Sequence, residues 1–158
     1  MRAAKEVKVI LITSGDPASI STEITIKAIE SKRINKNVNL VAITDPTLVE
    51  RYKKLIRSNI KINKIKDEIK FSDYKHHYLN IIPIKLENSF ENGKPDIKNS
   101  SFTKFSIIKT IEIYNNSIAS AIVTNPINKY LMYKSGFNFE GHTDFLGSLS
   151  RKKSTQLW

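Results

Sequence analysis

Three short stretches of this chain carry residue types that can hold an anion or a polar ligand. In one of them, residues 124–129, two asparagines, a threonine and Lys129 follow an apolar run that predicts a buried strand at 119–123. The Lys129 ammonium can pair with a carboxylate or a phosphate, and Asn128 stands beside it. The same residues also suit an ordinary polar turn between a strand and a helix, so both interpretations are kept.

A second stretch, Gly15-Asp16-Pro17, follows a predicted strand and precedes a predicted helix. At such a position backbone N–H groups and a helix N-terminus can hold an anion. The stretch lacks the glycines of a dinucleotide fingerprint and the Gly-Lys-Ser/Thr of a P-loop. The alternative is a tight turn in which Asp16 caps the following helix.

The third stretch is Gly141-His142-Thr143-Asp144, at the start of the last predicted helix. His142 is either part of a site or a solvated neighbour of a helix cap. In the second interpretation Thr143 is the N-cap and Asp144 is favoured by the helix dipole. The local pattern does not decide between them. The other two histidines, His76 and His77, are adjacent in a charged stretch, cannot easily chelate one metal ion, and are predicted to lie at the surface.

Hydrophobic periodicity indicates which elements must position these residues. Strands alternate with helices, which favours an α/β fold with a largely parallel sheet flanked by helices. Ligands bind at the carboxyl ends of strands in such sheets, where 13–17, 45–46 and 124–129 fall. The predicted strands are 7–12, 39–44, 60–65, 78–84 and 119–123, and the predicted helices are 18–34, 47–58, 102–114, 129–134 and one opened by 141–144.

Apolar residues at helical spacing predict which helix faces are buried. These predicted stripes are Ile20, Ile24 and Ala28; Leu48, Tyr52 and Leu55; and Phe102, Phe105, Ile108 and Ile111. Residues 87–100 have loop composition, and Gly136 is predicted to end the short helix at 129–134.

Composition limits the class of protein. The chain has 158 residues, of which 40% are hydrophobic and 26% charged, with no cysteine and no apolar run long enough to span a bilayer. A cytoplasmic location is expected. The net charge of +11 suggests a polyanion, but 21 of the 26 basic residues are lysine, which drift toward A/T-rich codons also produces. A nucleic-acid partner is therefore not expected, and neither is a membrane.

Taken in order, "TSGDPASISTEI" and "VTNPINKYLMYKSGFNFEGHTDFL" resemble the 4-phosphohydroxy-L-threonine dehydrogenase family of vitamin B6 biosynthesis. The resemblance is nearly continuous over 122–146 and looser from residue 7 onward. It implies an isopropylmalate-dehydrogenase-like architecture of two α/β domains with the site between them. The first domain is expected to cover 1–120, and 121–158 is expected to begin the second.

The resemblance also implies a reaction. The family oxidises a phosphorylated hydroxy amino acid with NAD or NADP, and the 3-oxo acid loses CO2. It uses a divalent metal, Zn, Mg or Co, and works as a homodimer. His142 and Thr143 match the substrate-binding residues, and Asp16, Asn128 and Lys129 are possible ligand-edge residues. The metal ligands, most cofactor contacts and the catalytic groups are expected in the half of the family's length that this chain does not cover.

The resemblance departs from the family pattern in its first motif. The family has Pro-Gly-Asp-Pro-Ala-Gly-Ile-Gly-Pro-Glu, whereas Ser14, Ser19, Ser21 and Thr22 stand here for the first proline, two glycines and the second proline. Losing two glycines predicts less room for close backbone approach to a ligand. The alternative function is a truncated or degraded relic acting, if at all, as a basic non-enzymatic binding domain.

Overall fold

The computed structural model describes residues 7–31, 33–68, 70–138 and 142–149, which form a five-stranded parallel sheet with helices on both faces. The strand order is β3-β4-β2-β1-β5, and all four strand pairs are parallel. The predicted α/β class and all five predicted strands are confirmed. The strands are β1 (Lys8–Thr13), β2 (Val38–Thr44), β3 (Lys61–Lys64), β4 (Tyr78–Pro83) and β5 (Ala119–Val123).

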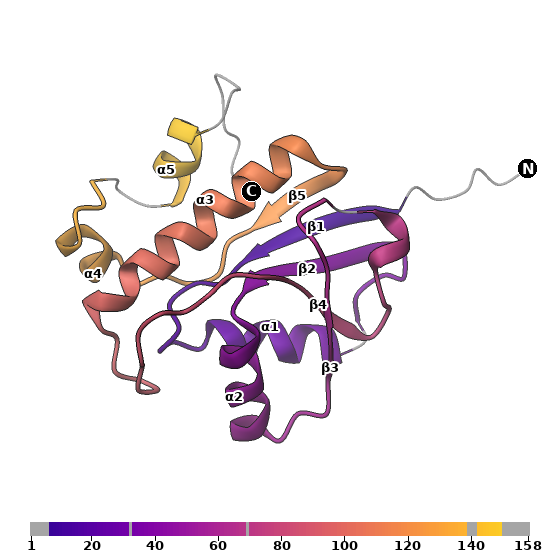
Figure 1. The fold of residues 1–158 in the computed structure, drawn as a ribbon, viewed down its shortest axis with the longest axis horizontal. Helices are drawn as coiled ribbons and strands as arrows, with labels where there is room; N and C mark the ends of the chain where they lie inside the picture. The colour runs from indigo at the N-terminus through magenta and orange to yellow at the C-terminus, as the bar shows by residue number, and fades with distance from the viewer. Residues whose placement is uncertain (1–6, 32, 69, 139–141, 150–158) are drawn as a thin grey trace, which may run out of the picture.

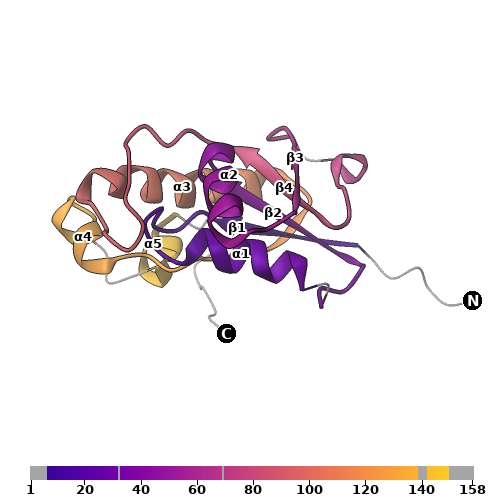
Figure 2. The ribbon, with the colours of Figure 1, turned by 90° about the horizontal axis from the view of Figure 1, so that it is seen from below.

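The helices form two layers around the sheet. α1 and α2 lie against each other on one face, and α3 crosses the other face over β1, β2 and β5 (Figures 1 and 2). α4 and α5 pack beside α3. The helices are α1 (Ser21–Glu30), α2 (Pro46–Ile56), α3 (Ser100–Asn116), α4 (Lys129–Lys134) and α5 (His142–Leu149), with two short 3-10 turns at Phe71–Asp73 and Ile97–Asn99.

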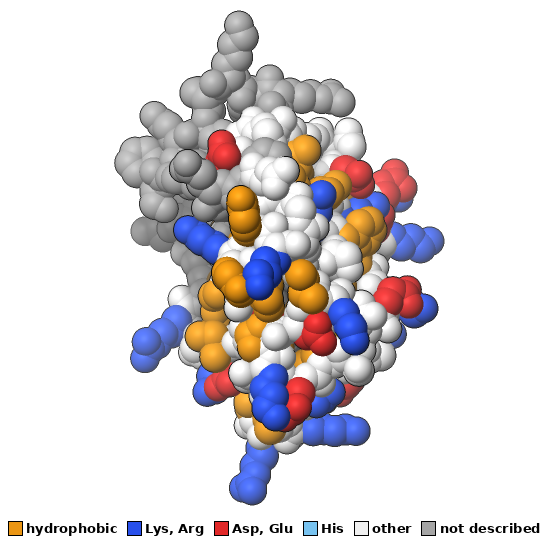
Figure 3. All heavy atoms as spheres, turned by 90° about the vertical axis from the view of Figure 1, so that its left-hand side faces the viewer, with side chains coloured by type: hydrophobic (Ala, Val, Ile, Leu, Met, Phe, Trp, Pro, Cys, Tyr) orange, Lys and Arg blue, Asp and Glu red, His pale blue; other side chains and the backbone are white. Residues whose placement is uncertain are grey.

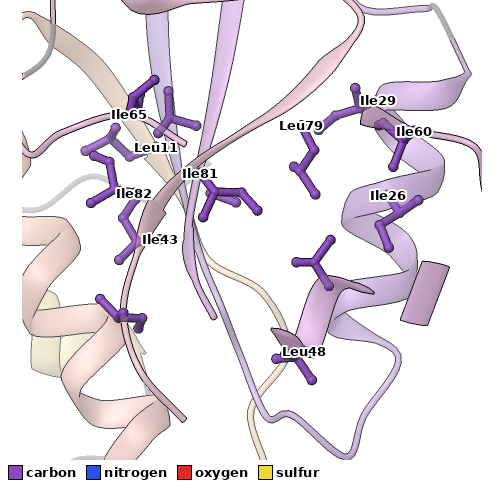
Figure 4. Close-up of a cluster of buried hydrophobic side chains, with 14 of the residues drawn as sticks. Leu11, Ile26, Ile29, Ile43, Leu48, Ile60, Ile65, Leu79, Ile81 and Ile82 are labelled. Carbon is purple, nitrogen blue, oxygen red and sulfur yellow. The ribbon is translucent and has the colours of Figure 1, made fainter. Parts of the chain in front are cut away.

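The core fills both faces of the central strands because these strands are aliphatic at nearly every position. Leu11, Ile43 and Ile82 lie toward α3, whereas Leu79 lies toward Ile26 of α1 on the other face (Figure 4). Each such side chain contributes about 1.5–3 kcal/mol by leaving water. The sheet is therefore a rigid support for the loops at its edges.

The predicted buried face of α1 is wrong. Ile20 and Ile24 are 60% and 38% exposed, and the buried residues include Ser21 and Thr25. Hydrogen bonds explain the difference: both hydroxyl side chains bond to the segment that follows β5, so they share the buried face with Ile26 and Ile29. α1 is also shorter than predicted at both ends.

The stripes predicted on α2 and α3 hold only in part. Leu55 of α2 is 56% exposed, although Leu48 and Tyr52 are buried. On α3, Phe105 is 50% exposed, while the hydroxyl-bearing Ser106 is fully buried. Spacing alone could not identify these faces, because buried serine and threonine side chains satisfy backbone groups of the sheet and helix.

β5 is an edge strand and not the buried strand that its composition predicts. It pairs only with β1 in the described part of the chain, and Val123 is 49% exposed. The predicted domain boundary at Ser120 falls inside β5, and the division of the chain into two domains stays a prediction. A second apolar cluster joins α3 to the segment after β5 through Ile107, Ile111, Met132, Phe137 and Phe145.

Candidate functional site

Three loops meet at the carboxyl edge of the sheet, as expected for ligand sites in this class of fold. They are residues 14–20 after β1, 84–99 after β4 and 124–128 after β5. The Asp16 N–H donates to the Pro126 carbonyl oxygen at 3.2 Å, and the Gly93 N–H donates to the Ala18 oxygen at 2.8 Å. The predicted ligand-edge stretches around Asp16 and Asn128 are therefore neighbours in space.

Gly15 allows this close approach. Its φ is +72°, in the left-handed region that favours glycine. A Cβ atom at this position would lie 2.7 Å from the Pro126 carbonyl oxygen and closer still to the Ser21 hydroxyl. No other residue type fits between the first loop and α1 without displacing the loop after β5.

Asn125 fastens the loop after β5 to the rest of the edge. Its backbone N–H donates to the Thr13 hydroxyl at 3.0 Å, and its side-chain amide donates to the Thr13 carbonyl at 2.9 Å and the Thr25 hydroxyl at 2.8 Å. Asn125 is only 7% exposed. In the sequence, Asn125 is one of several polar residues of a predicted turn, and no local pattern marks it as the residue that joins this loop to β1 and α1.

Buried hydroxyls continue this network beneath the loops. The Ser14 N–H donates to the Ser106 hydroxyl at 2.8 Å, and the Ser14 hydroxyl lies 2.9 Å from that of Thr44. The Ser106 hydroxyl in turn donates to the Ile43 carbonyl oxygen at 2.9 Å. A polar cavity of about 10 Å³ beside Ser14 and Asn125 has room for about one water molecule. The edge is therefore held by hydrogen bonds more than by apolar packing.

Asp16 is the most chemically distinctive residue of the first loop. It is 7% exposed, and its Oδ1 accepts one hydrogen bond, from the Ala18 N–H at 2.9 Å. Burial raises the pKa of the Asp16 carboxyl, and the Ala18 hydrogen bond only partly opposes this. The cap interpretation is wrong: α1 has Ile20 at its N-cap, with no side-chain cap. A buried carboxyl with a raised pKa beside a ligand edge is typical of functional sites.

Asp45, in one of the three stretches predicted at the ligand edge, connects α2 to the loop at residues 84–99. Its Oδ1 caps α2 by accepting from the Thr47 N–H, and its Oδ2 accepts from the Leu86 N–H, both at 2.6 Å. Burial alone would raise the pKa of the Asp45 carboxyl, but the hydrogen bonds from Leu86 and Thr47 outweigh it and lower the pKa. Asp45 is thus held ionised, whereas burial acts against the charge on Asp16.

Asn128 and Lys129 lie at the start of α4. Asn128 is the N-cap, and its Oδ1 accepts from the Leu131 N–H at 3.1 Å, so its amide oxygen already has a partner. Lys129 is exposed. A groove of about 640 Å³ separates α4 from residues 89–97, lined by Lys94 and Lys134 among others, and Lys129 lies outside it. Figure 3 shows the molecule from the side of α4, where Lys and Arg side chains alternate with acidic ones.

His142 and Thr143 form the first turn of α5, so Thr143 is inside the helix and is not its N-cap. α5 is held against the rest of the chain by Phe145, whose ring meets that of Phe137 edge-on at 4.6 Å between centroids. The side chains of His142 and Thr143 lie outside the described part, and their predicted contact with substrate stays a prediction. His76 and His77 are exposed, as predicted.

Within residues 7–31, 33–68, 70–138 and 142–149, no group of three His, Cys, Asp or Glu residues could hold a metal ion. These residues therefore do not supply the donor set for the divalent metal that the family resemblance implies. In the same residues, no helix is both long and apolar enough to cross a membrane.

A parallel α/β sheet whose carboxyl edge carries converging polar loops defines the class: an open α/β fold, in which ligands commonly bind at that edge. The family model described as pyridoxal phosphate biosynthetic protein PdxA matches residues 36–157, and the chain belongs to this family. The suspected resemblance is thereby confirmed.

Individual relatives agree with the family match. The chain is 31% identical over 150 residues to 4-hydroxythreonine-4-phosphate dehydrogenase of Sulfurihydrogenibium sp., covering 91% of this chain and 43% of that protein. It is 28% identical over 150 residues to D-threonate 4-phosphate dehydrogenase of Salmonella typhimurium, covering 94% and 46%. The chain thus spans less than half the length of these relatives.

A solved structure shows the same fold. The crystal structure of a 4-hydroxythreonine-4-phosphate dehydrogenase from Burkholderia phymatum matches with a TM-score of 0.81 at 22% identity, covering 92% of this chain and 44% of that one. The relatives support a dehydrogenase family, which is an oxidoreductase class, whose named substrates are phosphorylated hydroxy acids.

Proposed function

We propose that this chain forms one part of an NAD(P)-dependent dehydrogenase that oxidises the secondary alcohol of a phosphorylated hydroxy acid. The observation that carries the proposal is the family match over residues 36–157, which includes the loop after β5 and all of α4 and α5. The relatives named above act on 4-hydroxythreonine 4-phosphate or D-threonate 4-phosphate. Both molecules present a phosphate and a secondary alcohol, so the substrate class is proposed and not a single substrate.

For 4-phosphohydroxy-L-threonine the proposed reaction is an oxidation followed by a decarboxylation. The alcohol carbon gives a hydride to NAD or NADP and the hydroxyl gives up its proton. The resulting 3-oxo acid then loses CO2 and becomes 3-amino-2-oxopropyl phosphate. We also propose that a divalent metal takes part in the reaction, held by groups that the described residues do not supply.

This chain's own contribution would be to bind and orient the substrate. An imidazole and a hydroxyl on the first turn of a helix suit an anionic, hydroxylated molecule, which gives His142 and Thr143 their proposed role. Lys129 is exposed at the same edge of the sheet and would attract the phosphate. Gly15 and Asn125 hold the loops in place. We further propose that the complete enzyme is a homodimer and that the 158-residue chain alone does not turn over.

The test uses a fusion of residues 1–149 to the part of the Sulfurihydrogenibium relative that lies beyond its matched region. The fusion is expected to reduce NAD or NADP, followed by absorbance, with one of the two named substrates and a divalent metal. The chain alone is expected to give no more signal than a metal-free control. Turnover by the chain alone would show that the site is complete within these residues.

Variants of the fusion then test the binding residues. His142→Ala is expected to lower kcat/KM by about tenfold or more, since it removes a polar substrate contact, with the melting temperature nearly unchanged. His76→Ala is the matched control and should have normal kinetics. Lys129→Met should weaken substrate binding more than Lys134→Met does. A loss of several degrees with normal kinetics in His142→Ala would instead mean that His142 only stabilises the first turn of α5.

A further inference from the structure

A second cavity lies at the opposite, amino-terminal edge of the sheet. Its volume is about 470 Å³, within the range of about 300–1,000 Å³ that is typical of small-molecule sites. It is lined where β1, β2 and β4 begin, by Val7, by residues 34–40 and by residues 75–78. It shares no lining residue with the loops at the carboxyl edge and does not depend on the reaction proposed for them.

One polar side chain of the lining has no hydrogen-bond partner among the described residues. Asn39 of β2 is 7% exposed, and its side-chain amide makes no hydrogen bond within the part of the chain that the structure describes. The second buried asparagine of the lining, Asn80, is in contrast fully engaged: its Oδ1 accepts from Asn63 Nδ2 at 2.8 Å and from the Lys75 N–H at 3.0 Å. An amide that lines a cavity and has no partner among the described residues is a group that a ligand can bond.

The rim of the cavity is basic. Lys36, Lys75, His76 and His77 line it, and no aspartate or glutamate does. Neither lysine forms an ion pair with another described residue. The nearest acid in sequence, Asp73, instead accepts from the Lys70 N–H of its own turn at 2.9 Å. Such a rim attracts an anion, because its positive groups lack local counter-charges.

The remaining walls are apolar or aromatic. Val7, Ile29, Ile34 and Leu40 contribute aliphatic surface, and Tyr78 contributes a half-buried ring. A bare inorganic ion would leave this surface wet, whereas a ligand with a flat apolar body would cover it. The body would also bring hydrogen-bonding atoms within reach of the Asn39 amide, which pairs well with the edge of a heterocycle.

From this juxtaposition we infer a second binding site at the amino-terminal edge, which takes a small organic phosphate with a ring-shaped body. The phosphate is held at the rim by Lys36 and Lys75 with the two histidines. The ring lies over the apolar wall and is bonded by Asn39. Adenosine monophosphate is a suitable probe because it combines both parts at the right size.

Binding is measured by equilibrium dialysis of the chain with labelled adenosine monophosphate, with adenosine and inorganic phosphate as competitors. The monophosphate is expected to bind about tenfold or more tightly than either competitor, since each offers only half of the contacts. Inorganic phosphate binding as tightly as the monophosphate would overturn the inference, because the apolar wall would then contribute nothing. Absence of saturable binding at millimolar probe would overturn it as well.

Variants locate the site. Lys36→Ala/Lys75→Ala is expected to weaken binding about tenfold or more by removing two charge-assisted contacts. Lys98→Ala/Lys104→Ala changes the net charge equally at exposed positions outside the cavity and should change affinity less than about twofold. Asn39→Leu should weaken binding without lowering the melting temperature, since it removes an unpartnered amide. Equal losses in both lysine pairs would show nonspecific attraction and refute the site.

Discussion

Replacing Gly15 by alanine tests whether the meeting of loops at the carboxyl edge depends on this residue. Alanine at φ +72° costs about 1–2 kcal/mol in backbone strain. Its Cβ would also lie 2.7 Å from the Pro126 carbonyl oxygen, a backbone atom that cannot swing away. Overpacking of this kind costs about 1–3 kcal/mol more. The expected loss is therefore about 2–5 kcal/mol, a large share of the roughly 5–15 kcal/mol that stabilises an ordinary domain.

The assay is urea unfolding of Gly15→Ala beside a matched control, Gly136→Ala. Gly136 has a φ of +86° but nothing within 4 Å of the position of a Cβ, so alanine there meets only the strain of about 1–2 kcal/mol. The difference between the two variants isolates the clash with Ser21 of α1 and with Pro126 of the loop after β5, about 1–3 kcal/mol. Equal losses in the two variants would refute the claim that the close approach, and not the backbone conformation alone, requires glycine.

Three further outcomes are expected from the same measurement. Burial raises the pKa of Asp16 above 3.8, so the fold favours the protonated carboxyl. The resulting stabilisation is full below about pH 3.8 and is lost as the pH rises through the folded-state pKa. Asp16→Asn should therefore stabilise the chain at pH 7 relative to wild type but not at pH 3, and a pH-independent difference would contradict this. Asn125→Leu should cost about 2–4 kcal/mol, because it removes the amide that donates to the buried Thr13 carbonyl and Thr25 hydroxyl. A loss below about 0.5 kcal/mol would contradict this. The free energy of unfolding of Phe105→Ser should stay within about 0.5 kcal/mol of wild type, whereas Ile107→Ala should lose about 2–5 kcal/mol. The reverse order would support the orientation of α3 that the sequence predicts.

The sequence predicts the backbone plan well because the strands are buried on both faces. Continuous aliphatic runs such as those of β2 and β4 leave few alternatives, and turn signals such as Asp45-Pro46 mark where they end. The short helix α4 is predicted at both ends, since Asn128 caps its start and Gly136 follows it at positive φ. Residues close together in the sequence determine the strands and the ends of α4, so these features can be predicted from the sequence.

Helix orientation is a different matter, because it depends on partners that are distant in sequence. Ser21 faces inward because its hydroxyl donates to the Pro126 carbonyl, 105 residues away. Ser106 does so because it bonds Ser14 and Ile43 at separations of 92 and 63 residues. Hydrophobic periodicity treats serine as polar and therefore predicts it on the exposed face of a helix. The same reason hides the contacts of Asn125 with Thr13 and Thr25 and the contact of Asp45 with Leu86, whose partners are distant in sequence.

The serines of the first loop show how the departures from the family pattern fit this fold. The Ser19 hydroxyl donates to the Asp16 carbonyl at 2.8 Å, and the Ser21 hydroxyl donates to the Pro126 carbonyl at 3.0 Å. Ser21 has no exposed surface. Both hydroxyls are therefore used within the protein, where they tie the first loop to itself and to the loop after β5. Gly15, the glycine whose φ and contacts exclude a side chain, is retained. The substitutions thus alter how the loop is fastened: Ser21 places a hydroxyl on the same Pro126 carbonyl oxygen to which the Asp16 N–H donates.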